Sequence, residues 1–198
     1  MMIAQLPNAI TLTRLLLVVP IGYCMLQEYW YTVLILLVLA GLTDLFDGLL
    51  ARKFGWETRF GQIVDPIADK LTFGTVVVLL TLHGSIPLWL TVVVFAREFV
   101  ILLGAVLYRL LFKTLEVQPL FVSKLNTVLQ VVLLALIVLS LANESAGQAL
   151  QSIVDPIGFW VVAVSAFVSG AAYVFVWSKK ASEHGNSSPY SSNTDGIP

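Results

Sequence analysis

Residues 44–69 read DLFDGLLARKFGWETRFGQIVDPIAD and lie between two long apolar runs. Aspartates occupy positions 44, 47, 65 and 69, whereas charged residues are rare elsewhere in those runs. A carboxylate at the centre of a membrane helix costs roughly 2.5 kcal/mol or more, so acids kept at this cost are candidates for function. The stretch therefore predicts a functional site at a membrane surface.

The composition around this stretch is that of a membrane protein. The chain has 198 residues, of which 58% are hydrophobic and only 12% are charged. The mean hydropathy of +0.90 is far from the balance of a soluble domain. A single cysteine, Cys24, excludes a disulfide framework and a cysteine metal site.

Six apolar segments are each long enough to span about 30 Å of hydrocarbon. They cover approximately residues 8–27, 30–52, 62–82, 86–112, 120–142 and 152–178. The prediction is an all-α integral membrane protein with six transmembrane helices and both termini on one side. Residues 1–178 form its one domain, and residues 179–198, rich in Ser, Asn and Gly, are expected to be a disordered tail.

The positions of lysine and arginine predict the orientation of these helices. Basic residues border or occupy the second and fourth connections and begin the tail: Arg52, Lys53, Arg59, Arg109, Lys113, Lys124, Lys179 and Lys180. The other three connections contain neither lysine nor arginine. The termini and the aspartate cluster are therefore expected on the cytoplasmic side.

The spacing of the aspartates predicts a metal site. Asp44, Asp47 and Gly48 share one face at the end of the second span, and Asp65 and Asp69 lie one turn apart at the start of the third. Four converging carboxylates repel one another unless protons or cations neutralise them. Oxygen ligands without His or Cys select Mg²⁺ or Mn²⁺, and a pair of such ions suits phosphate chemistry. The alternative is a set of helix caps and ion pairs with nearby basic residues.

The pattern Asp44-x2-Asp47-Gly48-x2-Ala51-Arg52-x8-Gly61-x3-Asp65-x3-Asp69 resembles the signature of the CDP-alcohol phosphatidyltransferase family, with no position missing. The similarity extends from Pro7 to about Trp177. The resemblance implies a dimeric enzyme that transfers a phosphatidyl group from CDP-diacylglycerol to an alcohol and releases CMP.

The resemblance also implies roles for individual residues. Asp44, Asp47 and Asp65 would hold one divalent ion, and Asp44, Asp65 and Asp69 a second, with Asp69 also the general base. Positions matching family contacts to the CDP part are Gly48, Arg52 and Thr58, with Asn8 and Thr11 as weaker candidates from the first span. Without the resemblance, the start of the first span reads equally well as a capped helix with a snorkelling arginine.

The segment that bears on the acceptor alcohol is Ser123-Lys124-Leu125-Asn126-Thr127. In phosphatidylglycerophosphate synthases the corresponding place resembles Gly-Lys-x-Lys-Thr, so Asn126 stands where a second lysine would be. One cation fewer suits a less charged acceptor. This form is similar to eukaryotic-type cardiolipin synthases, which implies phosphatidylglycerol as acceptor. The alternative acceptor is glycerol 3-phosphate, because Ala96-Arg97-Glu98 is more like the glycerophosphate enzymes.

Two arginines of the fourth span complete the candidate acceptor site. Arg97 and Glu98 lie in the middle of the fourth span. They either form ion pairs with other helices, or Arg97 lines the acceptor pocket. Arg109 lies near the cytoplasmic end, where contact with solvent or lipid headgroups is common. The alternative from a different functional class is a cation transporter. A cation pathway would need carboxylates near the membrane midplane or on both sides, whereas the four aspartates cluster at one surface. We expect lipid substrates, no nucleic-acid partner, and a location in a bacterial inner membrane.

Overall fold

The chain is all-α throughout the part described by the computed structural model, residues 6–54, 59–112 and 121–186. Its helices are α1 Leu6–Leu26, α2 Trp30–Phe54, α3 Arg59–Leu82, α4 Leu88–Phe112, α5 Phe121–Ala142, α6 Glu144–Ile153 and α7 Phe159–Asn186, with a π-helical turn, η2, at Val154–Gly158. Each of the six expected apolar segments contains one long helix. The all-α prediction is therefore confirmed over these residues.

Some of these helices are long and apolar enough to cross a membrane. Within the described ranges, three stretches meet this condition: Leu88–Leu107 in α4, Phe121–Ala142 in α5 and Phe159–Ser178 in α7. Shorter apolar stretches, Leu15–Leu26 and Trp30–Thr43, lie in α1 and α2. The structure thus supports membrane-embedded helices, while six spans and cytoplasmic termini stay predictions.

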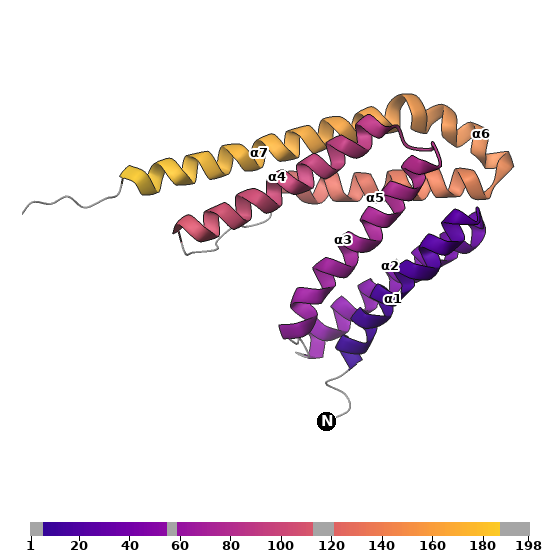
Figure 1. Cartoon of the computed structure of the whole chain (residues 1–198), viewed down its shortest axis with the longest axis horizontal. Coiled ribbons are helices and arrows are strands. Elements are labelled where there is room, and N and C mark those ends of the chain that lie inside the picture. The colour runs from indigo at the N-terminus through magenta and orange to yellow at the C-terminus, as the bar shows by residue number, and fades with distance from the viewer. Residues whose placement is uncertain (1–5, 55–58, 113–120, 187–198) are drawn as a thin grey trace, which may run out of the picture.

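The helices form two groups that meet near the turn between α3 and α4 (Figure 1). In the first group α1 packs against α2 and α3, and in the second α7 packs against α4 and α5. Contacts of α2 with α5 and of α3 with α4 join the groups. The start of α1, the end of α2 and the start of α3 lie together at the bottom of the view in Figure 1. The aspartate-bearing ends are therefore on the same side as the N-terminal end of α1.

The buried core lies where the two groups meet. Ile21, Val33, Leu80, Leu90 and Val138 come from five different helices, are at most 2% exposed and belong to one connected cluster. The first three come from the ends of α1, α2 and α3 that lie away from the aspartates. Large apolar side chains elsewhere on the long helices are exposed, as expected for surfaces that face lipid. The aspartate-bearing ends are therefore anchored by packing at the opposite ends of their helices.

The connection after α5 differs from the sequence-based expectation. A short helix, α6, follows α5 directly, and Asn143 caps it, because its Oδ1 accepts a hydrogen bond from the Ser145 backbone N–H at 3.0 Å. Pro156 lacks the N–H that an α-helix needs, and the backbone forms the π-helical turn η2 at this point. Length and hydropathy predict the spanning helices but carry no signal for a short helix at their ends.

The last helix is longer than expected. α7 continues to Asn186, so residues 179–186, which we expected in a disordered tail, are helical. The remainder of the expected tail, residues 187–198, lies outside the described residues.

Candidate active site

The proposed metal ligands lie on two helix ends joined by a short connection. Asp44 and Asp47 are in the second half of α2, and Asp65 and Asp69 are in the first half of α3. Only residues 55–58 separate the two helices, and a chain reaches at most about 3.5 Å per residue. The two carboxylate-bearing ends are therefore kept at the same end of the molecule (Figure 1).

Of these four acids, the structure describes the side chain of Asp69 alone, and it is exposed. The side chains of Asp44, Asp47 and Asp65 lie outside the described set. Among the described side chains, no group of three acidic, His or Cys residues is placed to hold a metal ion. The donor set itself fits Mg²⁺ or Mn²⁺, because carboxylate oxygens are the ligands that these hard cations prefer.

The candidates for contact with the CDP part lie at the same end. Gly48 and Arg52 are on α2, and Asn8 and Thr11 are in the first two turns of α1. Figure 1 draws the start of α1 and the end of α2 at the same end of the molecule, and the two helices pack against each other. Thr58 lies outside the described residues, as do the side chains of the other four.

Arg97 sits inside the second group of helices and joins three of them. It is 7% exposed, and its Nε and Nη2 donate to Ser169 Oγ of α7 at 3.3 and 3.0 Å. Nη2 also donates to Ser123 Oγ of α5, and Nη1 to Glu98 Oε1 on its own helix. Glu98 in turn pairs with Lys70 of α3, with 3.5 Å between Oε2 and Nζ. A helix-to-helix ion pair, one of the two expectations for this region, is therefore made by Glu98 with Lys70, whereas Arg97 pairs with Glu98 on its own helix and reaches α5 and α7 through serine hydroxyls.

The other candidate residues for acceptor binding differ in their exposure to solvent. Lys124 is exposed in the first turn of α5, whereas Asn126 is completely buried. Asn126 Oδ1 accepts a hydrogen bond from Ser165 Oγ of α7 at 2.7 Å, and its Nδ2 has no partner among the described residues. Arg109 lies near the end of α4, and its side chain is outside the described set. A ligand at the start of α5 would therefore meet Lys124 first, and Asn126 only if α5 and α7 separate.

Sequence reasoning gave no role to several polar residues around Arg97. Ser123, Ser165 and Ser169 all contact a candidate residue. Gln130 is 4% exposed, its Nε2 has no hydrogen-bond partner within the described part of the chain, and it lines a cavity of about 20 Å³ beside Thr91. A signal was available, because polar residues three or four apart in an apolar run share one helix face. Ser123, Asn126 and Gln130 have this spacing, as do Ser165 and Ser169.

Apolar helices of membrane-spanning length, with a full set of spaced aspartates on two adjoining helix ends, define a polytopic membrane protein with an acidic site. Residues 4–171 match the CDP-alcohol phosphatidyltransferase family, and the chain belongs to that family. The membership confirms the resemblance on which the residue roles were assigned.

Individual relatives carry two different names. The chain is 35% identical over 147 residues to the cardiolipin synthase (CMP-forming) of Rattus norvegicus, covering 66% of this chain and 48% of the relative. It is 33% identical over 175 residues to the CDP-diacylglycerol–glycerol-3-phosphate 3-phosphatidyltransferase of Rickettsia felis, covering 85% of this chain and 93% of the relative. A probable phosphatidylglycerophosphate synthase of Mycobacterium tuberculosis is 43% identical over 105 residues, which cover 52% of this chain and 48% of the relative. The chain thus spans about half the length of the rat protein and most of the Rickettsia protein.

Proposed function

We propose that this protein transfers a phosphatidyl group from CDP-diacylglycerol to phosphatidylglycerol, giving cardiolipin and CMP. The observation that carries the proposal is the complete aspartate pattern on the adjoining ends of α2 and α3, in a chain that belongs to the CDP-alcohol phosphatidyltransferase family. We further propose that the protein acts as a homodimer in a bacterial inner membrane, with this site facing the cytoplasm.

The proposed site takes two divalent cations, Mg²⁺ or Mn²⁺. Asp44, Asp47 and Asp65 would hold one ion, and Asp44, Asp65 and Asp69 the other, through oxygen atoms alone. When bound, such ions offset the negative charge of a diphosphate and make its phosphorus more electrophilic. Gly48, Arg52 and Thr58 would bind the CDP part, with Asn8 and Thr11 from the start of α1.

The proposed reaction is a single displacement at phosphorus. The Asp69 carboxylate takes the proton of the acceptor hydroxyl as its oxygen forms a bond to the phosphorus that bears diacylglycerol. The bond from that phosphorus to the oxygen of CMP breaks, and CMP leaves from the opposite side. Asp69 is exposed on α3, so an acceptor can reach it. The phosphoanhydride bond of the donor is thus exchanged for a phosphodiester bond in the product, and the proton of the acceptor hydroxyl leaves on Asp69.

The proposed acceptor is phosphatidylglycerol because the α5 segment offers few cations. Lys124 is exposed, whereas the neighbouring position that would supply a second cation holds the buried, neutral Asn126. A phosphodiester carries one negative charge, but the phosphate monoester of glycerol 3-phosphate carries up to two and favours a second cation. The second candidate acceptor is glycerol 3-phosphate. The chain aligns with 93% of the length of a relative that is named for that substrate.

A product assay with the purified protein decides between these acceptors. CDP-diacylglycerol and Mg²⁺ or Mn²⁺ are supplied with phosphatidylglycerol in one reaction and with glycerol 3-phosphate in another. We expect cardiolipin from the first reaction and no lipid product from the second. Formation of phosphatidylglycerophosphate alone would overturn the proposed acceptor but keep the reaction class.

A further inference from the structure

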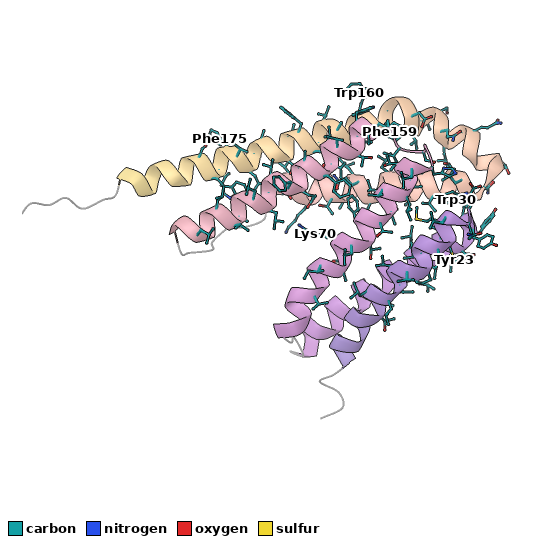
Figure 2. All side chains as sticks on the ribbon, in the orientation of Figure 1. Tyr23, Trp30, Lys70, Phe159, Trp160 and Phe175 are labelled. Atoms are coloured by element: carbon teal, nitrogen blue, oxygen red, sulfur yellow. The ribbon has the colours of Figure 1, made fainter. Side chains whose placement is uncertain are left out.

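The ion pair between Lys70 and Glu98 links the helix of the proposed base to the helix of Arg97. Lys70 follows Asp69 directly on α3, and its Nζ lies 3.5 Å from Glu98 Oε2 on α4. Figure 2 shows Lys70 on the side of α3 that faces α4. The Glu98 side chain is 29% exposed and that of Lys70 is 58% exposed. The contact is therefore a bridge between the two helix groups and next to the aspartate motif.

Glu98 is held from two directions at once. Its Oε1 accepts a hydrogen bond from Arg97 Nη1, while its Oε2 faces Lys70. Arg97 is fixed in turn, because its guanidinium donates to Ser123 of α5 and Ser169 of α7. Ser169 is completely buried, so this end of the chain of contacts is set in the packed interior. One continuous series of polar contacts therefore runs from α3 through α4 to α5 and α7.

We propose that Glu98 is a positioning residue, which holds Asp69 at a fixed place relative to the acceptor side of the site. The inference rests on the proposed function for the role of Asp69. Glu98 acts through Lys70 on α3 and through Arg97 on α4, and it touches neither substrate.

The chemistry of the site explains why such a contact matters. The proton acceptor comes from the first helix group, whereas Lys124 comes from the second. A displacement needs the reacting atoms within about 3.5 Å of each other, and a misplacement of about 1 Å can cost on the order of 100-fold in rate. A contact between Lys70 and Glu98 is therefore suited to keep the two groups in register.

A double-mutant cycle on purified protein tests the proposal. The variants are Lys70→Gln, Glu98→Gln and the double substitution, each of which removes charge with little change of size. We expect each single variant to lower kcat by on the order of 10-fold, with KM for CDP-diacylglycerol unchanged. The double variant should be no slower than either single variant, because both act through one contact. Lys70→Arg keeps the cation and should restore most of kcat.

The matched control is Glu28→Gln, the same chemical change on an exposed acid between α1 and α2. Glu28 Oε1 lies 3.9 Å from His83 Nε2, at the ends of α2 and α3 opposite to the aspartates, and its substitution should leave kcat unchanged. Losses that multiply in the double variant would show that Lys70 and Glu98 act independently and would overturn the proposal. A Glu98→Gln effect confined to KM would also overturn it, since that is the behaviour of a binding residue.

A distance measurement separates this proposal from the proposed activity. Spin labels on cysteines at Leu71 of α3 and Leu110 of α4, both exposed, report the separation of the helices in a Cys24→Ser background. We expect Glu98→Gln to broaden and shift the distance distribution, whereas Glu28→Gln should not. An unchanged distribution would contradict the positioning role. If the unsubstituted protein released no CMP, the proposed function would fail, but the distance result would still decide whether Glu98 holds α3 against α4.

Discussion

Asp69 and Lys70 are neighbours on α3, yet the proposed chemistry needs them for different purposes. Asp69 is assigned the proton of the acceptor hydroxyl, while Lys70 points its charge at Glu98 of α4. Neighbouring residues on a helix face directions about 100° apart, so one can face the site while the other faces a packing partner. The motif thus carries a catalytic and a structural function in adjacent positions.

Substitution of Asp69 by Asn tests its role as base. The amide keeps the size of the side chain but cannot take a proton at neutral pH, so we predict that Asp69→Asn retains CDP-diacylglycerol binding and loses turnover by at least about 100-fold. Donor binding by calorimetry and CMP release are measured on the same preparation.

Asp155→Asn is the matched control, because it makes the same change at an exposed acid of η2, outside the motif. Its turnover should equal that of the unsubstituted protein. If Asp69→Asn lost donor binding but kept its turnover per bound donor, Asp69 would not be the general base.

Residue spacing predicted the aspartate motif and did not predict its polar surroundings. The four aspartates are visible in the sequence because each is rare in an apolar run and their offsets match helical turns. The contacts of Arg97 with Ser123 and Ser169 depend on how α4, α5 and α7 pack, and no local pattern encodes a partner 26 or 72 residues away. Buried serines also leave little trace in hydropathy.

Gly104 of α4 lies against the side chain of Trp177 of α7. A Cβ added at Gly104 would overlap the indole ring of Trp177, which occupies the space where a side chain would be. Small residues allow this kind of approach between membrane helices. The position of the last helix against α4 therefore depends on the absence of a side chain at this residue.

Gly104→Ala should destabilise the protein even though alanine favours a helix. We predict a loss of about 1–3 kcal/mol from overpacking, seen as a lower melting temperature in detergent. Gly41→Ala on α2 is the matched control, because its added Cβ would meet no described atom within 4 Å outside its own helical backbone, and it should be neutral or slightly stabilising. Equal melting temperatures for the two variants would show that Trp177 moves aside without cost.

The long elements were more predictable than the connections between them. Apolar length predicts α1 to α5 to within a few residues, because burial in lipid selects for it, whereas α7 begins at Phe159 and not at the expected residue 152. α6 and η2 were missed, since they depend on a cap at Asn143 and on the missing N–H of Pro156. The extension of α7 to Asn186 was missed because its residues are polar.

At the scale of the whole molecule, the two helix groups divide the proposed reaction between them. The first group carries the aspartates and the candidates for CDP contact, and the second carries Arg97 and Lys124. The turn from α3 to α4 and the Lys70–Glu98 pair connect them. The overall arrangement could not be predicted from the sequence, because the crossing of the groups depends on packing between segments distant along the chain.

Metal-dependent release of CMP from CDP-diacylglycerol is the measurement that tests the central claim most directly. Purified protein is given CDP-diacylglycerol and an acceptor lipid, with Mg²⁺ or Mn²⁺ or with a chelator in its place. We predict CMP release with either cation, none with the chelator, and none from Asp44→Asn at the same metal concentration, since Asp44 is assigned to both ions. Absence of CMP with every acceptor, or equal release in the presence of the chelator, would contradict the account.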